Sequence, residues 1–151
     1  MYLAFYKGRK SENSRADWFD FIVCLFTSSR YSHVEILTEY DEETGEANAW
    51  SSTHRNSGIR MKHMNVHTNS WEVFRIKTDR TKEEVKDWFI KRDHHKYDWF
   101  GVLGVVLPFK FHKKRRWFCS EAVAASLGMR DPSKLTPELL WQSVTLLYRS
   151  H

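Results

Sequence analysis

Alternating hydrophobic and polar residues predict a small antiparallel sheet in the first half of the chain. The alternation indicates five strands, at residues 2–6, 32–37, 46–52, 59–64 and 71–76. In the second of these, the period of two puts His33, Glu35 and Leu37 on one face of the strand. Residues 41–45 are typical of a turn, so we expect the second and third strands to form a hairpin.

Helices are predicted where the hydrophobic period approaches that of an α-helix. They cover residues 17–28, a segment that begins at the capping box of residues 81–84, residues 119–127 and residues 137–147. Gly128 is a stop signal for the third helix, and Thr136 followed by Pro137 is a start signal for the fourth. Because the chain shows no repeat and no linker, we expect one α+β domain over residues 1–151, with a small antiparallel sheet flanked by helices.

Composition narrows the class of protein. Of the 151 residues, 41% are hydrophobic and 28% are charged, which excludes a disordered chain, and two cysteines exclude a disulfide-rich scaffold. The net charge of +5 favours an anionic partner such as nucleic acid or a phospholipid surface, with solubility alone as an equal explanation. The first residues lack the pattern of a signal peptide, and the longest apolar run, residues 101–109, is about half as long as a membrane span. We therefore expect a cytoplasmic protein with reduced thiols and no transmembrane segment.

Cys119 is the candidate nucleophile. It lies at the predicted start of a helix, where backbone N–H groups and the helix dipole stabilise a thiolate. A basic run just upstream adds positive potential, and it consists of Lys113, Lys114, Arg115 and Arg116. The alternative is a buried cysteine that packs under its helix, since free cysteines are among the most buried residues. That is our interpretation of Cys24, which falls in the middle of a predicted helix.

A nucleophilic cysteine needs a base that a third group holds in place. Seven of the eight histidines fall in polar loops, at strand ends or at the terminus, whereas His33 lies in the interior of a short predicted strand, and Glu35 shares its face. Residues at this spacing are about 6.6 Å apart along a strand. Two polar residues on an exposed strand face are unremarkable alone, so the inference depends on their combination with Cys119.

Four short segments occur in an order that resembles a known family. They are residues 32–35 (Ser-His-Val-Glu), 97–101 (Tyr-Asp-Trp-Phe-Gly), 118–121 (Phe-Cys-Ser-Glu) and 135–139 (Leu-Thr-Pro-Glu-Leu). Their order and spacing resemble the circularly permuted branch of the NlpC/P60 papain-like superfamily of cysteine hydrolases, in which the His strand precedes the Cys helix. The resemblance spans roughly residues 2–147, and the chain looks most like small phage-encoded members. It implies a permuted papain-like fold.

The resemblance assigns roles to the matching residues. It makes Cys119 the nucleophile and His33 its general base, and it matches Tyr97 to a tyrosine that helps to position the oxyanion. The backbone N–H of Cys119 would donate to that oxyanion, as helix N-termini do.

The third member of the triad has two candidates. Glu35 shares the face of His33, and Asn48 lies nearest to the position of the family's polar residue on the next strand. We prefer Glu35. Ser51 and Ser52, at the end of that next strand, are candidate pocket residues.

The reaction that the resemblance implies is acyl transfer to cysteine. The Cys119 thiolate attacks an amide or ester carbonyl, His33 protonates the leaving group, and water releases the acyl group. Peptides, cell-wall peptides and lipid esters are substrates in the superfamily, and the sequence does not choose among them. We expect no metal or cofactor, because metal-ligand spacings and phosphate-loop glycines are missing from the sequence. The alternative is a non-catalytic protein of the same fold, whose basic run with interleaved aromatic residues binds nucleic acid or a host protein.

Overall fold

The fold combines one sheet with helices, as the computed structural model shows for residues 1–7, 30–53, 58–93, 95–97 and 116–149. The strands are β1 (Tyr2–Lys7), β2 (Tyr31–Tyr40), β3 (Glu46–Thr53), β4 (Gly58–Asn65), β5 (Trp71–Arg75), β6 (Lys96–Tyr97) and β7 (Arg116–Trp117). The helices are α2 (Lys82–Ile90), α4 (Cys119–Ser126), the 3-10 helix η1 (Pro132–Lys134) and α5 (Pro137–Arg149). The five strands and the last three helices that the hydrophobic pattern predicts are confirmed. The α+β class is therefore shown.

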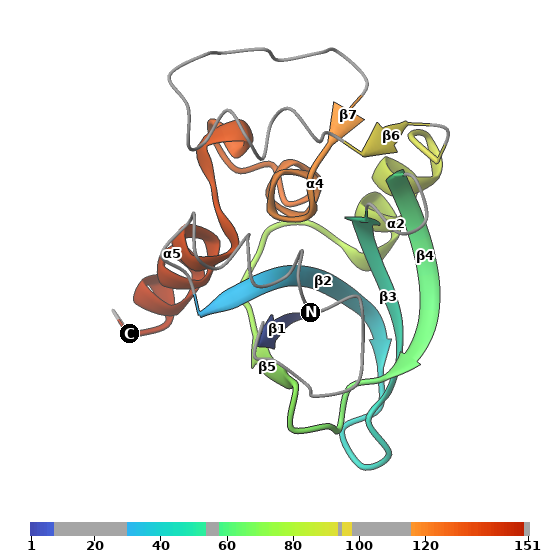
Figure 1. Cartoon of the computed structure of the whole chain (residues 1–151), viewed down its shortest axis with the longest axis vertical. Coiled ribbons are helices and arrows are strands. Elements are labelled where there is room, and N and C mark those ends of the chain that lie inside the picture. Colours follow the sequence, from blue (N-terminus) through green and yellow to red (C-terminus); the bar gives the residue numbers. More distant parts are fainter. Residues whose placement is uncertain (8–29, 54–57, 94, 98–115, 150–151) are drawn as a thin grey trace.

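The described strands form one sheet in the order β5-β1-β2-β3-β4-β6-β7. The first five strands along the chain pair antiparallel, whereas the two-residue strands β6 and β7 pair parallel with each other. Figure 1 shows that the sheet is strongly curved and that α4 lies between α5 and α2 over it. β2 is an interior strand, between β1 and β3, so residues near its start can meet the helix that covers the sheet.

The two faces of the sheet bury different side chains, as the alternation along β2 predicts. Val34 and Ile36 belong to the main core, together with residues of α2, α4 and α5. Leu37 belongs to a second cluster on the other face, with alanines of β1 and β3. The period of two in the sequence is therefore confirmed by which residues pack together.

Two local signals that fix helix ends are also confirmed. Thr81 and Glu84 form the capping box at the start of α2, because each side chain accepts a hydrogen bond from the backbone N–H of the other. Gly128 follows α4 with a φ of 73°, a left-handed conformation that favours glycine after a helix.

Part of the sequence prediction concerns residues outside the described ranges. They are the predicted helix at residues 17–28 with Cys24, the apolar residues 101–109, and Lys113, Lys114 and Arg115 of the basic run. Within the described ranges, no helix has both the length and the hydropathy of a membrane span.

Candidate active site

His33 and Glu35 lie near the start of β2 and form one buried pair. His33 stands opposite Tyr6 of β1, and Glu35 stands opposite Ala4. His33 Nε2 lies 2.9 Å from Glu35 Oε1, with side-chain exposures of 19% and 1%. The ring of Trp71, on the edge strand β5, packs edge-on against the imidazole at a centroid distance of 6.4 Å. A buried carboxylate thus holds His33 at one of its two ring nitrogens.

Cys119 is the first residue of α4 and is only 3% exposed. Buried serine hydroxyls fix the backbone on both sides of it. Ser52 Oγ, on β3, donates to the carbonyl of Trp117 over 2.6 Å, and Ser120 Oγ donates to the carbonyl of Leu135 over the same distance. The start of α4 is therefore tied to the sheet on one side and to the loop after η1 on the other.

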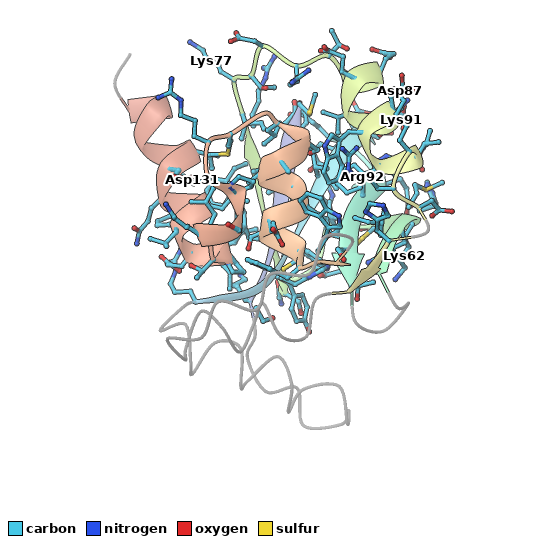
Figure 2. The ribbon with its side chains drawn as sticks, turned by 90° about the horizontal axis from the view of Figure 1, so that it is seen from above. Lys62, Lys77, Asp87, Lys91, Arg92 and Asp131 are labelled. Atoms are coloured by element: carbon cyan, nitrogen blue, oxygen red, sulfur yellow. The ribbon has the colours of Figure 1, made fainter. Side chains whose placement is uncertain are left out.

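An aromatic cluster supports β7, the strand that leads to Cys119. The rings of Trp117 and Trp88 of α2 pack edge to face at 5.0 Å, and the Arg92 guanidinium lies 4.2 Å from the centre of the Trp88 ring. Trp117 Nε1 donates to His95 Nδ1 over 3.0 Å. Figure 2 shows Arg92 in the region between α2 and α4. These contacts help to hold the segment before Cys119 against the rest of the domain.

His33 reaches Cys119 where β2 meets α4. Burial lowers the pKa of His33, but the charge and hydrogen bond of the Cys119 side chain, followed by those of Glu35, outweigh burial and raise it to about 10. An imidazole with this pKa is a cation at neutral pH. The contact therefore pairs an imidazolium with the sulfur of Cys119.

Arg60 of β4 binds the same carboxylate, and the sequence analysis did not identify it. Arg60 Nη2 donates to Glu35 Oε1 over 2.5 Å, and the Arg60 side chain is 14% exposed. Burial works to raise the pKa of Glu35, but His33 and Arg60 together hold it below its ordinary range. In the sequence, Arg60 is one basic residue of a predicted strand. The pairing of β3 with β4, which sets Ser51 opposite Arg60, is what brings it to the site.

Asn48, the other candidate for the third position, lies elsewhere on the sheet. Its Nδ2 donates to Glu39 Oε2 over 2.8 Å, and its Oδ1 lies 3.1 Å from His63 Nδ1. Its described partners thus belong to an exposed polar group on β2 and β4, and His33 is not among them.

The remaining predicted residues surround the segments that carry the site. Ser51 and Ser52 are fully buried, and the Ser51 hydroxyl donates to the carbonyl of Val34 over 2.7 Å. Tyr97 lies on β6, where its backbone pairs with Trp117, and its side chain is outside the described part of the structure. Arg116 is the first residue of β7, and its side chain is likewise outside the described part.

Neither a metal site nor a relative of known function accompanies these residues in what the described ranges and the comparisons show. Within the described ranges, no three His, Cys, Asp or Glu side chains gather as a metal site would require. No model of a known protein family matches the chain, and no curated protein matches it. The geometry around Cys119 and His33 is therefore the feature of the molecule from which a function can be inferred.

Proposed function

We propose that the protein is a cysteine-dependent hydrolase that cleaves amides or esters through an acyl intermediate on Cys119. The observation that carries the proposal is the position of His33, which contacts the Cys119 side chain and the Glu35 carboxylate at once. A thiol, a base and a third group that orients the base form the arrangement that activates a cysteine nucleophile.

The two ring nitrogens of His33 have different roles in this mechanism. Nε2–H donates to Glu35 Oε1, so Nδ1 carries the proton that His33 exchanges with Cys119. Transfer of the thiol proton to Nδ1 gives a thiolate and an imidazolium, and the negative charge of Glu35 stabilises the imidazolium. The pKa of His33, raised to about 10, agrees with a resting site in which the imidazole is protonated.

The reaction consists of two acyl transfers. Cys119 Sγ attacks the substrate carbonyl carbon, and backbone N–H groups at the start of α4 donate to the oxygen that becomes negative. His33 gives its proton to the leaving amine or alcohol as the C–N or C–O bond breaks, which leaves a thioester. Water then attacks the thioester while His33 accepts a proton from it, and the acid product departs as the Cys119 thiolate forms again.

The proposed fold is the permuted papain-like fold of the NlpC/P60 superfamily. Its support is the order of elements, because the strand with His33 precedes the helix that begins at Cys119. A cytoplasmic setting accords with the Cys119 thiol, which is free and would stay reduced there. The substrate class remains amides and esters, from peptides and cell-wall peptides to lipid esters.

Transient acylation of Cys119 tests this proposal. The variant Cys24→Ser, which retains Cys119 as its one thiol, is incubated with 4-nitrophenyl acetate and followed by intact mass and by nitrophenolate release. We expect one acetyl group on the protein, with more than one equivalent of nitrophenolate released over time. Cys119→Ser should abolish both signals, and His63→Ala should change neither. A native protein that releases no nitrophenolate above its Cys119→Ser variant would contradict the proposal and favour the non-catalytic binding protein.

A further inference from the structure

The contact between Arg60 and Glu35 has the geometry of a weak structural ion pair. Its described hydrogen bond is a single one, Nη2 to Oε1, although an arginine and a carboxylate can form two in parallel. Arg60 Nε and Nη1 and Glu35 Oε2 are buried, and within the described structure none of the three has a hydrogen-bond partner. Buried polar atoms without partners cost free energy, and a buried ion pair is weak evidence for stability. The pair therefore needs an explanation other than the stability of the fold.

The Arg60–Glu35 pair lies next to the two residues of the proposed reaction, His33 and Cys119. Glu35 Oε1 accepts hydrogen bonds from both His33 Nε2 and Arg60 Nη2, so one carboxylate oxygen serves two cations. His33 in turn interacts with the side chain of Cys119. From β4 to α4, the groups alternate in charge once the proposed reaction has formed the thiolate: Arg60 is positive, Glu35 negative, His33 positive and Cys119 negative. A fully buried carboxylate tends to take up a proton unless cations lie close to it.

We infer that Arg60 is a positioning residue for the reaction. By binding Oε1 it keeps Glu35 ionised and directed at His33, and it acts on Cys119 only through these two residues. The inference rests on the proposed function, because it gives Arg60 a purpose only if His33 and Cys119 react as a pair. On the neighbouring strand β1, the residue opposite His33 is Tyr6, a titratable residue whose ring packs against Trp71.

A double-mutant cycle separates this role from a structural one. In the Cys24→Ser background, the variants Arg60→Met, Glu35→Gln and the double variant are alkylated with iodoacetamide at about pH 7 and followed by intact mass. We expect Arg60→Met to slow alkylation of Cys119 about tenfold when Glu35 is present and less than about twofold when residue 35 is glutamine, which is a coupling of at least about 1 kcal/mol. Arg60→Lys, which keeps the charge, should restore most of the rate.

Three further comparisons separate a loss of positioning from a loss of folding. The double variant removes both buried charges, so its melting temperature should be closer to that of the parent than those of the single variants are. Arg80→Met is the matched control, because Arg80 forms an exposed pair with Glu84 at 3.1 Å and should leave alkylation unchanged. As a second readout, Glu35→Gln should shift the alkaline limb of alkylation by the iodoacetate anion to lower pH, since His33 loses its anionic partner. Arg60→Met should shift this limb in the same direction by a smaller amount, since Glu35 remains but is no longer directed at His33.

The outcomes distinguish this inference from the proposed function. If Arg60→Met and Glu35→Gln slow alkylation by factors that multiply, Arg60 does not act through Glu35. If Arg60→Met lowers the melting temperature but keeps the parent rate and pH profile, its role is structural. Either result overturns the inference while the hydrolase proposal stands. If His33→Ala leaves the Cys119 rate unchanged, the hydrolase proposal fails and the role of Arg60 fails with it.

Discussion

Two histidine–carboxylate pairs lie on the same sheet at nearly equal distances. His33 Nε2 and Glu35 Oε1 are 2.9 Å apart, and His63 Nε2 and Glu46 Oε2 are 3.1 Å apart. Their surroundings differ. The side chains of the first pair are 19% and 1% exposed, whereas those of the second are 67% and 45% exposed.

The difference shows that burial and further partners, rather than distance, make one pair a candidate for catalysis. Water screens the interaction between the exposed side chains of His63 and Glu46, so that interaction is weak. Glu35 is shielded from water and contacts two cations, and His33 also contacts a thiol, so each charge in this group strongly affects the others. The exposed pair therefore supplies matched control variants for the buried one.

The largest expected effect is on turnover. We expect His33→Ala to lower the rate of ester hydrolysis by about a thousandfold or more, because the nucleophile loses both its base and its cationic partner. His63→Ala should stay within about twofold of the parent, since its ring lies in an exposed pair. Hydrolysis of 4-nitrophenyl acetate measures both. Equal losses in the two variants would remove the distinction between the pairs.

The next effect is on the free energy of unfolding. Glu35→Gln leaves the Arg60 charge buried without an anion, so we expect it to lower the free energy of unfolding by about 3–5 kcal/mol. Glu46→Gln, at the exposed pair, should change it by less than about 0.5 kcal/mol. Urea denaturation at neutral pH measures both values. A Glu35→Gln variant as stable as the Glu46→Gln variant would mean that the Glu35 charge is not buried in solution.

The pH dependence of alkylation sharpens the comparison further. The pKa of His33 is raised to about 10, so the imidazole is a cation at all lower pH values and becomes neutral as the pH rises through 10. A cation beside Cys119 attracts the iodoacetate anion but not neutral iodoacetamide. We expect the ratio of the two alkylation rates to fall about five- to tenfold across this pH range.

The control for this profile is again the exposed pair. His63→Ala should reproduce the fall in the rate ratio, and His33→Ala should give a low ratio at every pH. A parent protein whose ratio stays constant from neutral pH to above 10 would show that His33 carries no proton next to Cys119.

The smallest expected effect is at Asn48. Asn48→Ala removes hydrogen bonds to Glu39 and His63 in the exposed polar group, so alkylation of Cys119 should change by less than about twofold. The same kinetics by intact mass provide the measurement. If Asn48→Ala slows alkylation as strongly as Glu35→Gln, the third position belongs to Asn48.

Local patterns explain why much of the fold could be predicted from the sequence. Alternation along residues 32–37 follows directly from a strand with one core on each face, as Ile36 and Leu37 show. The Thr81 capping box and Gly128 mark helix ends through contacts within a few residues. The pairing of His33 with Glu35 could be predicted in the same way, because residues two positions apart on a strand lie on the same face.

The register between paired strands could not be predicted from the sequence. This register determines where Arg60 and Asn48 lie relative to His33. Arg60 meets Glu35 from 25 residues away, through the pairing of β3 with β4. The pairing of β2 with β3 contains a register shift between Leu37 and Glu39, which sets Asn48 opposite Glu39. A one-residue shift of this kind has no signature in the local pattern of hydrophobic and polar positions.

The central claim, that the fold activates Cys119 through His33, can be tested by one comparison of the same thiol in two states. In the Cys24→Ser variant, the rate of alkylation by iodoacetamide at about pH 6 is measured in the native protein and in protein unfolded by urea. An unfolded thiol is almost entirely protonated at this pH, whereas a thiolate paired with His33 is already reactive. We predict that the native protein reacts at least about tenfold faster than the unfolded protein. A native protein that reacts more slowly than the unfolded one would identify Cys119 as an inert buried cysteine and contradict the account.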